Sequence, residues 1–137
     1  MFTLKTHNGK ESTAAFYILN KGMNAGKPLV KPCPNCFEVH LEKSEDFQTL
    51  YWLLYALWQA KAFHPYIGGS VIPFIRKKEL SDLIHHSIKR SIQTSPHLEK
   101  IQKIDQLQKH LTKQITQLQN LKTALTQNLL QQKSPGH

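Results

Sequence analysis

Residues 47–58 read FQTLYWLLYALW and belong to the most apolar stretch of the chain. The unbroken apolar run within it, from Leu50 to Trp58, is far shorter than the roughly 20 residues that cross a bilayer. Its spacing predicts a helix over residues 45–64 that stops ahead of Pro65, because the residue before a proline disfavours helical geometry. We expect this to be the central core helix, burying Phe47, Leu50, Tyr51, Leu54, Leu57, Trp58 and Phe63.

Upstream of this helix, glycine and proline separate short β-prone segments. Residues 15–19 form one such segment, and residues 37–41 (FEVHL) alternate apolar with polar side chains, which is the pattern of a half-buried strand. Between them, Gly22 and Gly26 predict an ordered turn over residues 20–28, because glycine adopts backbone angles that other residues avoid. The acidic side chains of this region, Glu38 among them, are expected at solvated edges.

Downstream of the helix, two more elements are predicted. Residues 71–75 (VIPFI) are β-prone, but Pro73 restricts them to an edge strand or a bulge, because proline cannot donate to a sheet. A second helix is predicted over residues 79–88 by apolar residues at helical spacing, namely Leu80, Leu83, Ile84 and Ile88.

The C-terminal third carries the clearest pattern. Apolar residues recur at steps of three and four, and they are Leu98, Ile101, Ile104, Leu107, Leu111, Ile115, Leu118, Leu121, Leu125 and Leu129. A helix over residues 97–133 would be about 55 Å long at 1.5 Å per residue, which is too long to bury its stripe on so small a domain. We therefore expect a partner helix, with Ile104, Leu111, Ile115, Leu118 and Leu125 carrying oligomerisation. The alternative is a helix folded back on its own core.

These patterns predict an α+β fold. Residues 1–94 would form a small mixed domain, with short strands around the core helix. Residues 95–133 would form a long amphipathic, coiled-coil-type dimerisation helix, and residues 134–137 a flexible tail.

Charge is distributed unevenly along the chain, whose formal net charge is +9. Residues 1–47 carry six lysines against five acids, whereas residues 48–137 carry twelve basic residues against four acids. Such an excess indicates an anionic partner such as nucleic acid, or a merely solubilising surface. The N-terminus lacks the charged-then-apolar form of a signal peptide, so the expected location is the cytoplasm, with no membrane partner.

Cys33, Cys36 and His40 form the only cluster in the sequence with metal-ligand character, and His85 or His86 could complete it, although nothing local pairs them with Cys36. A structural zinc site needs four ligands, usually supplied as two pairs, and this sequence supplies one pair. A redox pair needs a helix N-terminus to stabilise the thiolate, whereas a strand-like pattern follows Cys36. We therefore expect two unrelated cysteines in a proline-stiffened loop and no cofactor. We also find no convincing catalytic set, so no enzyme is expected.

Two basic segments are candidates for contact with an anion. The turn over residues 20–28 would present Lys21, Asn24 and Lys27, although its spacing departs from a nucleotide-binding phosphate loop. The three consecutive residues Arg76, Lys77 and Lys78 could neutralise phosphates, or could form a solvated run that caps the next helix.

Residues 47–130 resemble part of a known family. LYWLL at 50–54, GGSVIPFIRKKEL at 68–80, PHLEKIQKI at 96–104 and LKTAL at 121–125 follow in order. They resemble the second half of a target-recognition domain, with its spacer helix, from the DNA specificity subunit of type I restriction-modification enzymes. The usual second proline of the spacer opening is replaced by His97. Residues 21–28, outside this match, are reminiscent of small bacterial proteins with no assigned activity.

The resemblance implies a non-enzymatic reader of double-stranded DNA. In this interpretation Ser70 donates to phosphate, Asn24 reaches a base edge, and Lys21, Lys27, Arg76, Lys77 and Lys78 neutralise the backbone. The long helix would pair with a second copy, with a related specificity-type helix, or with a DNA methyltransferase subunit. The alternative is a protein-interaction module with the same fold that does not read DNA.

Overall fold

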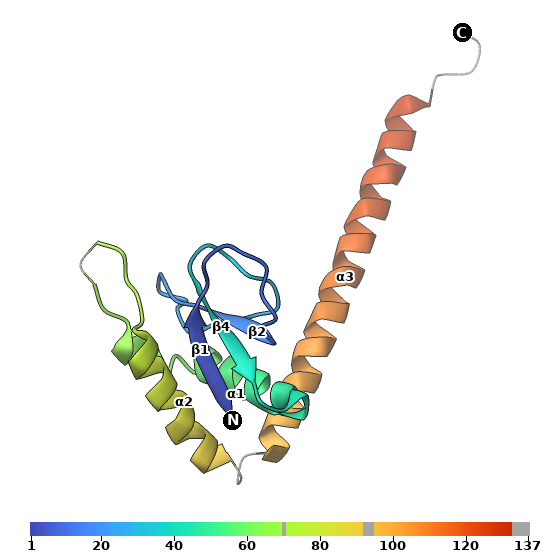
Figure 1. Cartoon of the computed structure of the whole chain (residues 1–137). Coiled ribbons are helices and arrows are strands. Elements are labelled where there is room, and N and C mark those ends of the chain that lie inside the picture. Colours follow the sequence, from blue (N-terminus) through green and yellow to red (C-terminus); the bar gives the residue numbers. More distant parts are fainter. Residues whose placement is uncertain (70, 92–94, 133–137) are drawn as a thin grey trace. The chain divides into compact units, whose positions relative to one another are not determined.

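The computed structural model describes residues 1–69, 71–91 and 95–132. The chain divides into two compact units, residues 1–99 and residues from 100 onward. The first unit contains strands β1 (Phe2–Thr6), β2 (Phe16–Leu19), β3 (Pro28–Leu29) and β4 (Cys36–Leu41), short 3-10 helices η1 (Ser44–Asp46) and η2 (His64–Tyr66), and helices α1 (Phe47–Gln59) and α2 (Lys77–Ser91). Helix α3 (Ser95–Gln131) makes up nearly all of the described second unit (Figure 1). The predicted α+β class is confirmed.

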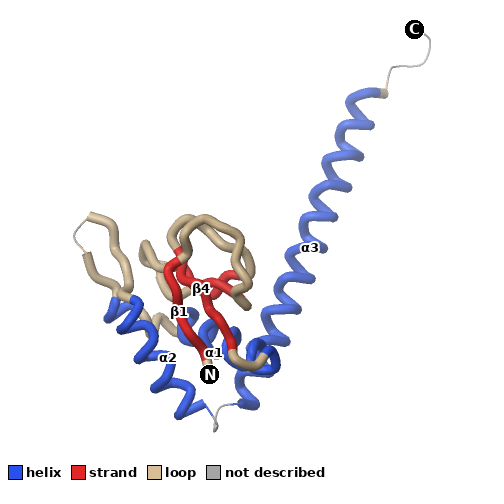
Figure 2. Tube along the Cα trace, viewed as in Figure 1, coloured by secondary structure: helices blue, strands red, loops and turns tan. Residues whose placement is uncertain are grey.

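The strands form one antiparallel sheet in the order β1-β4-β2-β3, joined by long loops (Figure 2). Strand β4 lies between β1 and β2, and Val39 is paired with both Leu4 and Phe16. Alternate residues of these strands face α1 and α2 and create one core. Its fully or nearly buried members include Phe2, Leu4, Phe16, Ile18, Phe37 and Val39 from the sheet, Leu50 and Leu54 from α1, and Leu80 and Ile84 from α2.

Helix α1 is the predicted core helix, but it ends at Gln59 and not near residue 64. Lys61 adopts a left-handed backbone with φ 60°, and the amides of Lys61 and Ala62 donate to the carbonyls of Trp58 and Leu57. This pair of bonds is a Schellman cap, which ends a helix most often at glycine. The predicted boundary was wrong because a lysine here occupies the glycine position. Phe63 is still buried, although it packs from the loop that follows the helix.

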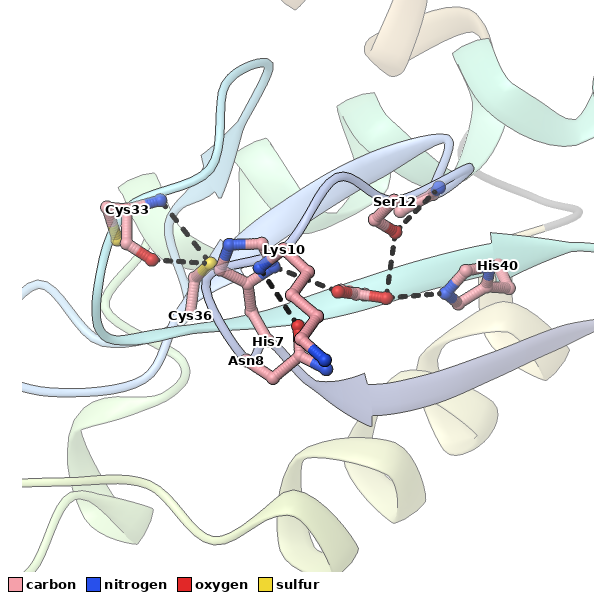
Figure 3. A network of polar contacts seen from close by, with 9 residues as sticks. His7, Asn8, Lys10, Ser12, Cys33, Cys36 and His40 are labelled. Carbon is pink, nitrogen blue, oxygen red and sulfur yellow. Dashed lines mark hydrogen bonds and ion pairs between the residues drawn. The ribbon is translucent and has the colours of Figure 1, made fainter.

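Two further strand expectations need correction. Residues 71–75 form no edge strand: Val71 is 90% exposed, and the segment has only isolated bridges, from Phe74 to Gly68 and to Lys21. Strand β4 is not half-buried, because Glu38 on its outer face is only 8% exposed. Figure 3 shows Ser12 from the loop after β1 beside the outer face of β4. That loop covers the face of β4 that the alternating sequence pattern predicted to be exposed to solvent.

The remaining elements agree with the sequence predictions. The segment at 15–19 is β2, and the predicted second helix is α2, two residues longer at its start and three at its end. The long C-terminal helix is α3, which begins at Ser95, the first residue of the predicted dimerisation helix. Residue 133, the predicted end of this helix, and the predicted tail at 134–137 lie outside the described residues. No helix within the described ranges combines the length and hydropathy that a membrane span requires.

Candidate functional site

The turn after β2 and the segment before α2 are joined by backbone hydrogen bonds. The amide of Gly22 donates to the carbonyl of Pro73 at 2.7 Å, and the amide of Ile75 donates to the carbonyl of Asn20 at 3.0 Å. Lys21 also forms an isolated antiparallel bridge with Phe74. The two basic segments singled out in the sequence are therefore neighbours in the fold, although more than 40 residues separate them along the chain.

Four exposed cations lie on or directly after the two joined segments. We call them the basic cluster: Lys21, Arg76, Lys77 and Lys78. Lys77 and Lys78 are the first two residues of α2, where the helix dipole is positive and a cation is unfavourable by about 0.3–1 kcal/mol. Lys89 and Arg90, in the last turn, have the favourable placement. Helix stability thus does not account for the two lysines at the start of α2, whereas an anionic ligand would make use of their charge.

The other predicted DNA contacts are placed differently. Asn24 is exposed on the turn, as expected. Lys27 is half-buried, and its ammonium lies 4.9 Å from the ring centroid of Trp58, a cation–π contact that ties the turn to α1. Ser70 lies outside the described residues.

Helix α3 carries the predicted apolar stripe on its surface. Ile104, Leu111, Ile115, Leu118 and Leu125 are between 48% and 66% exposed, and Leu107, Leu121 and Leu129 share the same arc. At 100° per residue the eight side chains fall within about 120° of the helix circumference, the width of one interaction face. We call these eight residues the apolar stripe. Between Ile104 and Leu129, Lys122 is the one charged side chain inside that arc, and it lies between Leu118 and Leu125.

Sequence reasoning missed a buried polar network on the outer face of β4 (Figure 3). Glu38 accepts hydrogen bonds from Nδ1 of His7 at 2.9 Å, from the hydroxyl of Ser12 at 2.8 Å and from Nε2 of His40 at 2.9 Å. These bonds, that from His7 foremost, lower the pKa of Glu38 to about 2. Glu38 is therefore ionised at neutral pH and can only accept, so both histidine nitrogens that face it carry protons. Nothing in the local sequence pairs residues 7 and 12 with residue 38.

The Glu38 network predicts a specific acid sensitivity. Because its folded pKa lies below the ordinary value of 4.5, Glu38 stabilises the fold above pH 4.5, and this contribution is lost as the pH falls toward 2. We expect Glu38→Gln to destabilise the protein at pH 6, with the difference from wild type shrinking between pH 4.5 and pH 2. Urea unfolding across this range measures it. Glu11→Gln, at an exposed carboxylate, is the control, and an equal effect of both substitutions would contradict the assignment.

The cysteine pair is organised by hydrogen bonds. The thiol of Cys36 donates to the carbonyl of Cys33 at 3.0 Å, and both cysteines are free (Figure 3). Burial raises the pKa of the Cys36 thiol, which favours the protonated, unreactive form. His40 points to Glu38 instead of to the sulfurs. Within the described ranges, no group of three or more histidine, cysteine or acidic side chains is placed to hold a metal ion.

Comparison with known proteins adds one finding. The model of a protein family described as "Family of unknown function (DUF6943)" matches residues 4–128, which include most of the sheet, α1, α2 and most of α3. No curated protein and no solved structure matches the chain.

Proposed function

Since the chain belongs to DUF6943, a family of unknown function, we propose its role from its own surfaces: a non-enzymatic, cytoplasmic DNA-binding protein that pairs through α3. The observation that carries the proposal is the basic cluster. Two segments distant in sequence are joined by backbone bonds, and together they present Lys21, Arg76, Lys77 and Lys78 to solvent.

Double-stranded DNA is the anion whose geometry suits this cluster. Its phosphates form a continuous row, so several cations on one surface can each neutralise one, and the amides at the start of α2 can add hydrogen bonds. The resemblance of residues 47–130 to type I specificity subunits supports the same proposal, because the matched segments include Arg76, Lys77 and Lys78. Asn24, exposed on the adjoining turn, is the candidate for a contact with a base edge.

Pairing through α3 is the second part of the proposal. Eight apolar side chains exposed along one helix are stabilised when another apolar surface covers them. A second copy of the same helix offers an apolar stripe of matching length. A related specificity-type helix, or a methyltransferase subunit, would meet the same requirement. The basic cluster of each copy would then contact one DNA molecule.

Binding to a mixed-sequence duplex at several salt concentrations tests the DNA proposal. We expect Lys77→Gln with Lys78→Gln to weaken binding and to reduce the slope of log K against log salt by about 1.8, because each phosphate contact contributes about 0.9. Lys89→Gln with Arg90→Gln removes the same charge from the other end of α2 and should leave the slope unchanged. The proposal fails if the wild-type protein does not bind at low salt, or if both pairs change the slope equally.

The exposed stripe favours a second candidate, a protein-interaction module with the same fold that does not read DNA. In that case Arg76→Glu with Lys77→Glu would leave the activity intact, whereas Leu111→Asp would abolish it. The two candidates therefore differ in which surface the function requires.

A further inference from the structure

The loop that joins η2 to α2 projects from the first unit (Figure 1). Two of its described residues are exposed aliphatic side chains. Val71 is 90% exposed and Ile72 is 58% exposed. We call these two residues the apolar tip. A single exposed aliphatic residue is ordinary on a protein surface. Two adjacent ones on a projecting loop expose apolar surface to water without contributing to the core, which indicates a binding role.

The base of this loop is fixed. Gly68 and Phe74 exchange backbone hydrogen bonds of 2.9 Å and 2.7 Å, and the Gly22 bond to Pro73 attaches the same region to the neighbouring turn. Gly69 has φ +113°, and a Cβ at this position would come within 2.7 Å of the carbonyl oxygen of Ile72. Position 69 therefore needs glycine, and the backbone bonds of Gly68, Phe74 and Pro73 hold the base of the loop beside the neighbouring turn.

The basic cluster adjoins this base. Lys21 is bridged to Phe74, and Arg76, Lys77 and Lys78 follow two residues later. The surface thus presents an apolar point next to cations. It matches a partner with an anionic exterior and an apolar interior, and DNA has this arrangement because its phosphates lie outside the stacked bases.

We propose, as an extension of the proposed function, that Val71 and Ile72 form a wedge that enters the minor groove between two base pairs and bends the duplex. The cations of the basic cluster bind the phosphates that flank this step. Aliphatic side chains are suited to the role because they partly unstack neighbouring bases.

An anionic membrane surface also has charged groups over an apolar interior, but the apolar tip is small for it. The two side chains have about half the carbon atoms of a myristoyl chain, and one such chain alone gives only marginal membrane binding. One or two aliphatic side chains are sufficient to open a base step. The size of the tip therefore favours DNA.

The test uses a duplex of about 25 base pairs with a fluorescent donor and acceptor at its ends. Binding of the wild-type protein should bend the DNA and raise energy transfer. Val71→Ser with Ile72→Ser should abolish this rise and weaken binding about tenfold, because the aliphatic contacts are lost. The salt slope should stay at the wild-type value, because no phosphate contact changes.

Val30→Ser is the matched control, since Val30 is 68% exposed on a different loop. It should leave both the bend and the affinity unchanged, and thermal melting of each variant verifies folding. If the tip variant still binds and bends DNA like wild type, the wedge is wrong and the DNA proposal stands. If wild type binds no DNA, both fail. Loss of binding to phosphatidylserine vesicles in the tip variant, with DNA binding intact, would assign the tip to membranes.

Discussion

Leu111→Asp combined with Leu118→Asp is expected to leave the protein monomeric at micromolar concentration. Both leucines lie at the centre of the apolar stripe, at 48% and 66% exposure. In a pair of helices the two substitutions would place four carboxylates in the apolar seam. Each of the four carboxylates replaces a buried leucine contact worth about 1.5–3 kcal/mol by an unpaired charge. The free energy of association is therefore weakened by more than about 6 kcal/mol, which is more than four orders of magnitude in the dissociation constant.

Light scattering across a range of protein concentrations measures this effect. Asn120→Asp with Gln127→Asp adds the same charge on the opposite side of the helix, about 160–180° from Leu111 at 100° per residue. This control should assemble like wild type. If both double variants assemble normally, or if wild type is monomeric at every concentration, α3 does not pair through the apolar stripe.

Gly26→Ala is expected to destabilise the first unit by about 2–5 kcal/mol, a large part of the 5–15 kcal/mol that holds a typical domain together. Gly26 has φ +100°, and a methyl group at this position would overlap the ring of Phe63, which is fully buried in the core. The backbone conformation costs about 1–2 kcal/mol for any residue with a Cβ, and overpacking a core adds about 1–3 kcal/mol.

The control lies in the same turn. Gly22 has φ +88°, but no atom lies within 4 Å of the Cβ that an alanine would introduce. Gly22→Ala should therefore show only the backbone cost. Urea unfolding followed by tryptophan fluorescence reports both variants, because Trp52 and Trp58 lie on α1 beside this core. Equal losses for the two alanine variants would show that contact with Phe63 contributes nothing.

Local periodicity was a good guide to the helices and the fold class. The apolar spacing of α2 and α3 depends on neighbours three and four residues away, which the sequence displays directly. The end of α1 was missed because Lys61 adopts the left-handed conformation that usually requires glycine, so no glycine marks the end of the helix in the sequence. Strand β1 was not predicted at all, and it is ordered by pairing with β4, more than 30 residues further along the chain.

The candidate sites, like the fold, could be predicted from the sequence only in part. Lys21, Arg76, Lys77 and Lys78 were singled out from their charge as candidates for contact with an anion, and all four are exposed. That the two segments carrying them are neighbours depends on backbone bonds between residues 20–22 and 73–75, which no sequence motif predicts. The Glu38 network was missed for a related reason, because alternation along β4 says nothing of a loop that crosses its outer face.

Helix α3 has few apolar contacts of its own over most of its length, and this has a thermodynamic consequence. A lone helix in water is marginal, so a helix stabilised by pairing obtains its stability from the abundance of its partner. In the proposed pairing, folding of α3 and assembly become one equilibrium governed by mass action. In such a pair Lys122 would weaken association, because a lysine in an apolar seam costs stability, and it would restrict the register in which the two helices align. The amount of protein in the cell would thereby set how much of it is folded along its full length.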